Sequence, residues 1–262
     1  MAAPVLSRED IEQIAGRVLS IYTEAYVPER HLFYQVNPEE LADVLGLEVD
    51  YQIPSPDGSI LGVTSPDEQY VPVYYDGEEC YYYLDGNTIL IDVRLCASPK
   101  TVGRKNYTLA HEIAHQILYK AFPDAYGPAR RLMCDYRRTP ESRRKVTDWT
   151  EWQADALAAA LLMPKDAVLD GMFLAGLGEH IGTLSRKYTP NKYDSFCRLA
   201  EALGVSRSAL AFRMERLGLL DKDRPIARRT RSPAIARSRN TDSRCSGLWP
   251  GTILKGMSSM SV

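Results

Sequence analysis

The 262-residue chain is poor in cysteine, and none of its cysteines has metal-binding spacing. The five cysteines are odd in number, no two of them form a CxxC motif, and they stand at Cys80, Cys96, Cys134, Cys197 and Cys245. This pattern excludes a disulfide scaffold, a zinc ribbon and a thioredoxin-type site, and it is typical of reduced thiols. We expect each cysteine to be a small buried or loop side chain.

Long hydrophobic runs are also absent. The longest run, Ala156–Met163, is far shorter than the roughly 20 residues that cross a bilayer. The N-terminal stretch MAAPVLSREDIEQIAGRVLS contains acidic residues where a secretion signal needs an apolar core. We therefore expect a cytoplasmic protein that has no membrane partner.

The composition, 45% hydrophobic and 25% charged, is that of a globular protein. At about 150 residues per domain, the length allows one or two domains. The net charge of −2 is unevenly distributed, because residues 221–262 contain nine Lys or Arg and three acidic residues and carry +6, which leaves −8 for the rest. This segment is also poor in hydrophobic residues. It predicts a disordered basic tail, either a solvated extension or a segment that binds nucleic acid.

Cap and turn signals in the first hundred residues predict two helices followed by a sheet. Ser7 is a helix cap, and Asn37-Pro38 begins a second, short helix. Strand-like runs follow at Leu47–Ile53, Ser59–Val63, Tyr70–Tyr75, Cys80–Leu84 and Thr88–Val93. Asp76-Gly77 and Asp85-Gly86 are hairpin signals between these runs, so we expect a small antiparallel sheet.

The second half of the chain has helical periodicity. The pattern predicts a helix over Asn106–Phe122, a second helix over Trp149–Met163, and two or three short helices over Tyr193–Leu219. Pro123 and Pro164 end the first two helices. The chain is therefore predicted to have an α+β fold.

An HExxH motif, His111-Glu112-Ile113-Ala114-His115, lies in the first of these helices. Positions i and i+4 share one face of a helix, with side-chain bases about 6 Å apart, so both imidazoles can bind one metal ion. The intervening Glu112 can reach a water bound to that ion. His111 and His115 are therefore predicted metal ligands and Glu112 a predicted catalytic base. The alternative is a helix with two hydrogen-bonded surface histidines.

A third ligand is predicted in the next helix. Metzincins have a glycine and a third histidine where this chain has Leu118 and Ala121, so that class is excluded. Glu151 and Asp155 again lie at i and i+4 of a helix. This spacing allows Glu151 to bind the metal while Asp155 accepts the outer N–H of a ligand histidine. The alternative is a pair of solvated acids.

Three blocks of the chain resemble the ImmA/IrrE family of bacterial metallopeptidases. They are TLAHEIAH, EWQADALAAALLMP and LAEALGVSRSALAFRMERLGLL, the last spanning Leu199–Leu220. Many relatives have an acid at the position of Gln153 and an asparagine at that of Asp155. The resemblance implies a small zincin-like (minigluzincin) fold, a zinc site and a protein substrate, often a repressor of a mobile element or a stress response.

This resemblance leads to a prediction of domains and function. We expect a metallopeptidase domain at 1–190, a helix-turn-helix-like segment at 191–220 packed on it, and the basic tail at 221–262. The predicted activity is zinc-dependent endoproteolysis of a specific protein, such as a helix-turn-helix repressor. Manganese or iron are alternative metals, because two imidazoles and a carboxylate also accept them. His180 and several tyrosines remain candidates for stabilising the oxyanion.

A different function remains open at this point. Residues 199–220 also resemble a DNA-binding helix-turn-helix, in which Ser206 would cap the second helix and Arg207, Arg213 and Arg216 could contact phosphates. The alternative is therefore a DNA-binding regulator that uses this segment and the basic tail. Glutamate-dependent proteolysis would indicate the enzyme, whereas salt-sensitive DNA binding by the metal-free protein would indicate the regulator.

Overall fold

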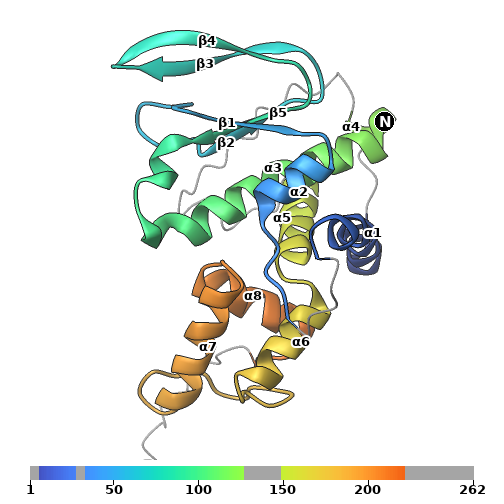
Figure 1. Ribbon diagram of the computed structural model, residues 1–262, viewed down its shortest axis with the longest axis vertical. Helices are drawn as coiled ribbons and strands as arrows, with labels where there is room; N and C mark the ends of the chain where they lie inside the picture. Colours follow the sequence, from blue (N-terminus) through green and yellow to red (C-terminus); the bar gives the residue numbers. More distant parts are fainter. Residues whose placement is uncertain (1–5, 28–32, 127–148, 222–262) are drawn as a thin grey trace, which may run out of the picture. The chain divides into compact units, whose positions relative to one another are not determined.

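The computed structural model describes residues 6–27, 33–126 and 149–221. Contacts divide the chain into two units, Met1–Asp223 and Arg224–Val262, and all the described residues belong to the first. Its helices are α1 (Arg8–Tyr26), α2 (Pro38–Val44), α3 (Val102–Ala121), α4 (Pro123–Tyr126), α5 (Trp149–Leu162), α6 (Lys165–Leu174), α7 (Pro190–Ala202) and α8 (Arg207–Leu217) (Figure 1). Its strands are β1 (Glu48–Gln52), β2 (Gly62–Thr64), β3 (Gln69–Tyr75), β4 (Glu78–Leu84) and β5 (Thr88–Asp92). Apart from Asp221, the predicted basic tail lies outside the described residues.

The predicted starts of the first two helices are confirmed. The Ser7 side chain accepts a hydrogen bond from the Asp10 backbone N–H, and the Asp10 carboxylate accepts one from the Ser7 backbone N–H, which completes a capping box. Asn37 caps α2 by accepting a hydrogen bond from the Glu39 N–H. After α2, Gly46 adopts a φ of 66°, which favours glycine and turns the chain toward β1.

The main sheet corrects the prediction of a purely antiparallel arrangement. Its strand order is β1-β5-β2, and β1 runs parallel to β5, whereas β2 runs antiparallel to it. Every residue of β5 is buried, as expected for the central strand. Strand β2 and a separate hairpin, β3–β4, lie between β1 and β5 in the sequence. Strand β1 therefore pairs with β5 and not with β2, the next strand along the chain.

The two Asp-Gly turns have different outcomes. Asp76 and Gly77, with φ of 50° and 87°, join β3 and β4 into the predicted two-stranded hairpin. Gly86 also has a positive φ, and Asp85 Oδ1 accepts the backbone N–H of Asn87 and of Thr88. This turn leads from the hairpin into the other sheet, so the predicted pairing of β4 with β5 is wrong.

The sheet is covered on both faces. Ile89 and Ile91 of β5 belong to the core that includes Leu109 and Ile113 of α3. Leu90, between them, points the other way and packs in a second cluster that contains Val71 and Val73 of β3, Val63 of β2 and Leu84 of β4. Helix α3 therefore lies against one face of the sheet and the hairpin β3–β4 against the other (Figure 1).

The helical part is built around α5, which contacts α3 and α1. Its alanines are small and buried, which permits close packing of these helices: Ala154, Ala156, Ala158, Ala159 and Ala160. Two boundaries differ from the prediction. Helix α3 begins at Val102, earlier than Asn106, and Pro164 both ends α5 and precedes α6, a helix that the sequence pattern did not indicate. Proline is tolerated there because the first helical N–H groups have no partner within the helix.

Helices α7 and α8 form a hairpin whose turn packs on the first turns of α3. The Asn106 side chain donates to the carbonyl of Gly204, at 2.9 Å. A Cβ built on Gly103 would lie 2.7 Å from the backbone nitrogen of Ser206, so the α8 N-terminus and α3 are in close backbone contact. A DNA-reading helix presents its N-terminal residues to the major groove. In this chain that end of α8 is held against α3.

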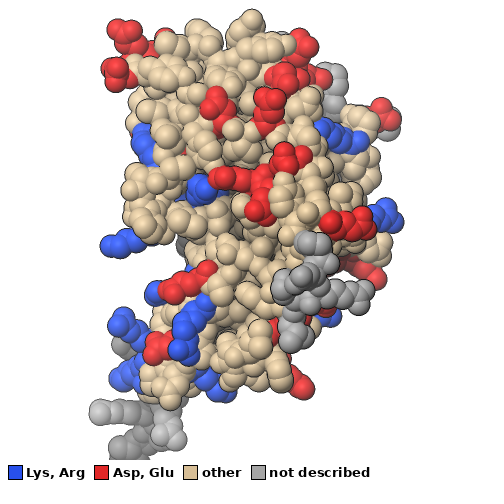
Figure 2. All heavy atoms as spheres, in the orientation of Figure 1, with Lys and Arg blue, Asp and Glu red and all other residues tan. Residues whose placement is uncertain are grey.

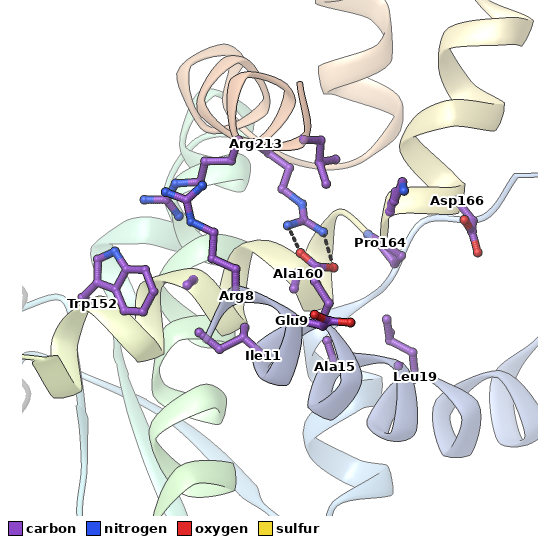
Figure 3. A pocket seen from close by; sticks show the side chains of 16 residues that line it. Arg8, Glu9, Ile11, Ala15, Leu19, Trp152, Ala160, Pro164, Asp166 and Arg213 are labelled. Carbon is purple, nitrogen blue, oxygen red and sulfur yellow. Dashed lines mark hydrogen bonds and ion pairs between the residues drawn. The ribbon is translucent and has the colours of Figure 1, made fainter. Parts of the chain in front are cut away.

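Arg213 overturns part of the DNA-binding interpretation. Its side chain is 4% exposed, and its guanidinium donates to both carboxylate oxygens of Glu12 in α1 (Figure 3). It also donates to the backbone carbonyl of Met163. These contacts bridge α8 to α1 and to the end of α5 beside a cavity of about 580 Å³. A guanidinium engaged in this way cannot contact a phosphate, and truncating Glu12 would leave the buried charge of Arg213 without its carboxylate partner.

Within the described residues, no helix is both long and apolar enough to cross a membrane.

We expect Gly103→Ala to destabilise the fold by about 1–3 kcal/mol, the range for overpacking. The added Cβ would lie 2.7 Å from the Ser206 nitrogen and 2.8 Å from the Val205 carbonyl carbon. Both are backbone atoms, so no side-chain rotation relieves the clash. Urea unfolding followed by circular dichroism measures the change in the free energy of unfolding.

Gly16→Ala is the matched control for this experiment. Gly16 lies inside α1, and its added Cβ meets nothing within 4 Å. Alanine there should stabilise by about 0.5–1 kcal/mol through helix propensity. Similar unfolding midpoints for the two variants would contradict the close contact between α3 and the α7–α8 turn.

Candidate metal centre

Helix α3 carries a polar turn into the interior of the protein. His111 is 1% exposed, and Glu112 and His115 are fully buried. Their neighbours Leu109 and Ile113 belong to the main core, and the helix contacts both α5 and the sheet. Because buried polar groups must be paired or coordinated, this turn requires partners from other elements.

Helix α5 supplies those partners. Glu151 Oε2 lies 3.3 Å from His111 Nε2, and Glu151 Oε1 lies 3.4 Å from His115 Nε2. The two imidazole Nε2 atoms are 3.0 Å apart. One ligand atom from each of these three residues lies within 4.8 Å of the others. The structure thus brings together the three residues that the sequence predicts as metal ligands.

The donor set and its spacing fit a divalent metal ion. Ligand atoms about 2 Å from one ion, in tetrahedral geometry, lie about 3.3 Å from each other. The three measured separations are close to that value. Two imidazole nitrogens and a carboxylate suit zinc and leave a fourth position for water or substrate. Glu151 is about one-third exposed, so the centre can be reached from solvent.

Asp155 lies one turn beyond Glu151 and faces the other nitrogen of a ligand imidazole. Its Oδ1 is 3.1 Å from His111 Nδ1. A carboxylate at this place holds the ring orientation and directs Nε2 toward the metal position. The Tyr107 hydroxyl donates to the Asp155 backbone carbonyl at 3.2 Å and links α3 to α5 beside this contact.

Burial and pairing shift the pKa values of these groups in opposite directions. Burial alone would lower the pKa of His111, but hydrogen bonds to Asp155 and Glu151 raise it to about 10. Burial lowers the pKa of His115. Burial opposes the ionisation of Glu151, yet its hydrogen bonds with both imidazoles hold the pKa of this carboxyl well below its usual range. The pocket therefore favours positive charge beside Glu151, which a divalent cation would supply.

Glu112 has no partner among the described residues. Both of its carboxylate oxygens are buried and make no hydrogen bond there. Burial raises the pKa of this carboxyl to about 8. A buried carboxylate left in this state is costly unless a water molecule or a cation interacts with it. This unpaired carboxyl group follows His111 in the same helical turn, beside the group of potential ligands.

The sequence predicted a strand over Ser59–Val63 but did not indicate that Gly62 in it borders Glu112. A Cβ built on Gly62 of β2 would lie 2.7 Å from Glu112 Oε1, so only glycine leaves room for the carboxylate. The next turn of α3 is tied to the same strand, because Gln116 Nε2 donates to Thr64 Oγ1 and to the carbonyl of Ser65. No local pattern indicates these contacts, since the partners are about fifty residues apart in the chain.

His180, a candidate for stabilising the oxyanion, has its polar partner outside the metal centre. Its Nε2 lies 3.2 Å from Asp221 Oδ1, and both side chains are exposed. It is not part of the metal-ligand group. Tyr119 is the tyrosine whose ring contacts His115, with centroids 5.8 Å apart.

Comparison with known families gives one finding. Residues 92–215 match the model of the family Peptidase_M78, described as the IrrE N-terminal-like domain. The matched segment begins at the end of β5 and includes α3, α5 and most of α8, so it contains all the residues of the centre. No curated protein matches the chain.

We expect the purified protein to bind about one divalent metal ion per chain, since a single set of three ligands is found among the described residues. His115→Ala should lose most of this metal, because removal of one of three protein ligands leaves an incomplete site. Elemental analysis after dialysis measures the ratio. His180→Ala is the matched control, because His180 lies outside the centre and should be dispensable for binding. Equal metal in wild type and His115→Ala would exclude the site.

Proposed function

We propose that this chain is a zinc-dependent endopeptidase that cleaves a specific protein, because its residues 92–215 match the Peptidase_M78 family and its three sequence blocks resemble the ImmA/IrrE metallopeptidases. One observation supports the proposal above the others. Two helices bring His111, His115 and Glu151 within ligand distance of one another, directly beside the unpaired carboxylate of Glu112. A metal-binding site without catalysis would not need a buried, unpartnered carboxylate at that position.

In the proposed mechanism, His111, His115 and Glu151 hold the metal. When bound, zinc lowers the pKa of water to about 7 and polarises the scissile carbonyl. Glu112 accepts a proton from the attacking water at its carboxylate and transfers it to the leaving amine. Asp155 holds the ring of His111 in orientation through Nδ1. Gly62 leaves the space in which the Glu112 carboxylate lies.

Strand β2 connects the sheet to the proposed catalytic base. Within the part of the chain that the structure describes, β2 pairs only with β5, and its three residues are buried. Gly62 of this strand borders Glu112, so the sheet fixes the space around the carboxylate.

For the substrate we propose a helix-turn-helix transcriptional repressor of a mobile element or a stress response. The family resemblance of the three sequence blocks supports this choice. Manganese or iron could replace zinc with the same ligands. The DNA-binding alternative is not proposed, because Arg213 is engaged with Glu12 and the N-terminus of α8 packs on α3.

We expect Glu112→Gln to retain the metal but to lose proteolysis by about 10²-fold or more, because the amide cannot accept a proton. The substrates to test are a repressor encoded beside the gene and unstructured casein, incubated with the metal-loaded protein. Cleavage of the repressor in preference to casein is expected. An exposed glutamate on the surface provides the control Glu179→Gln, which should cleave at the wild-type rate. Unchanged cleavage by Glu112→Gln would exclude its role as the base.

We expect Gly62→Ala to reduce the cleavage rate while the metal content stays near wild type. The new methyl group would lie 2.7 Å from Glu112 Oε1 and would displace the carboxylate without contacting the ligands. A displacement on the order of 1 Å at a catalytic group can cost roughly 10²-fold in rate. Gly16→Ala again serves as the control. Full activity of Gly62→Ala would show that Glu112 does not depend on this space.

A further inference from the structure

The hairpin β3–β4 presents a row of aromatic side chains on its outer face. The register places Tyr70 opposite Tyr83, Pro72 opposite Tyr81 and Tyr74 opposite Glu79. The rings of Tyr70 and Tyr83 are in contact, with centroids 5.4 Å apart. We call Tyr70, Pro72, Tyr74, Tyr81 and Tyr83 the tyrosine face.

The tyrosine face cannot turn inward to bury itself. The alternate residues Val71, Val73 and Leu84 pack against the main sheet, and the Tyr74 backbone N–H donates to the carbonyl of Ile53. A one-residue shift in register would expose these core side chains. Tyr70 therefore remains 70% exposed, Tyr81 68% and Tyr83 44%. Large aromatic side chains grouped on a surface in this way are typical of interaction sites.

The hairpin and its flanking turns are acidic. Residues 67–86 contain six Asp or Glu and no Lys, Arg or His, and the nearest basic residue along the chain, Arg94, is paired with Asp92. Glu79 accepts a hydrogen bond from the Tyr74 hydroxyl, and the Glu68 carboxylate lies close enough to Tyr83 to raise the pKa of its hydroxyl, so two carboxylates lie beside the rings. At the hairpin, which forms the top of the view in Figure 2, the surface is acidic or uncharged. Such a surface repels nucleic acid and anionic lipid.

We infer that the tyrosine face is a docking site for an arginine-rich segment of the protein substrate. Guanidinium groups stack on tyrosine rings and form strong hydrogen bonds with carboxylates, and this surface offers both at once. Aromatic rings also accept the flat guanidinium better than the compact ammonium of lysine. The identity of the segment as part of the substrate rests on the proposed function, whereas the binding of arginine does not.

The location of the tyrosine face suits a docking role separate from catalysis. The hairpin covers the face of the sheet opposite to α3, so the sheet lies between the tyrosine face and the metal centre. The edge strand β2 takes part in both regions, because Val63 packs under the hairpin and Gly62 borders Glu112. The same strand thus connects the packing beneath the tyrosine face to the region of the proposed catalytic base.

Fluorescence anisotropy tests the binding step on the full-length protein. The probe is a short labelled peptide in which arginine alternates with serine, compared with the same peptide carrying glutamate in place of arginine. The arginine peptide should bind, the glutamate peptide should not, and salt should weaken the binding. In Tyr70→Thr/Tyr81→Thr the affinity should fall roughly 5- to 30-fold, from the loss of two exposed cation–π contacts.

Controls separate this effect from a loss of structure. Threonine keeps a high strand propensity, and a thermal melt will establish whether the hairpin variant remains folded. Tyr188→Thr replaces an equally exposed tyrosine, 69% exposed and outside the hairpin, and should bind as wild type. Glu68→Gln/Glu79→Gln should weaken binding and reduce its salt dependence. Equal affinity of wild type and the tyrosine variant, or of the two peptides, would overturn the inference. The inference would also be overturned if the wild-type protein formed a dimer that is absent in the tyrosine variant and persists when the arginine peptide is added.

Cleavage assays separate this inference from the proposed function. A generic peptide substrate should be cleaved equally by wild type and Tyr70→Thr/Tyr81→Thr. When the same peptide is joined to the arginine segment, its cleavage by the wild type should become faster, and its cleavage by the variant should not change. If the arginine peptide binds in a tyrosine-dependent manner but no substrate is cleaved, the endopeptidase activity is refuted and the docking site is still supported. A cleavage rate that depends on neither the arginine segment nor the tyrosines would refute the docking site but not the endopeptidase activity.

Discussion

Burial of a polar helical turn is the constraint on which the arrangement around α3 depends. His111, Glu112 and His115 occupy one turn of a helix that is packed between the sheet and α5. Two imidazoles and a carboxylate at that depth are unfavourable unless other elements supply charge or hydrogen bonds. Helix α5 therefore carries Glu151 and Asp155 to the imidazoles, and β2 has a glycine where a side chain would collide with Glu112.

The other helices hold this arrangement in place through close contacts. The small buried residues of α5 bring it near α3, and Arg213 joins α8 to α1 and to the end of α5. The α7–α8 turn rests on the start of α3 at Gly103. The segment that resembles a DNA-binding motif thus contributes to the packing of the metal-bearing helix, and Arg213 is buried in this packing, whereas Arg207 and Arg216 are exposed.

Much of the local structure could be predicted from the sequence. The caps at Ser7 and Asn37 and the Asp76-Gly77 hairpin depend on residues only a few positions apart, and the structure confirms them. The spacing of His111 and His115, and of Glu151 and Asp155, likewise follows from helix geometry. That these two pairs would meet could only be expected from the resemblance and from chemical reasoning, because no spacing rule connects two helices separated by a long segment.

The sequence by itself determined most of the helices, the Asp76-Gly77 turn and the face of α3 that carries the motif, because these depend on local backbone preferences and on the helical period. The tertiary structure decided the parallel pairing of β1 with β5, the contact of Gly62 with Glu112 and the burial of Arg213 against Glu12. Each of these joins residues about 40 to 200 positions apart, so each depends on how the core closes as a whole. For the same reason the tyrosines of β3 and β4 are recognisable as a strand pattern, but only the packed inner face of the hairpin shows that their rings must remain in solvent.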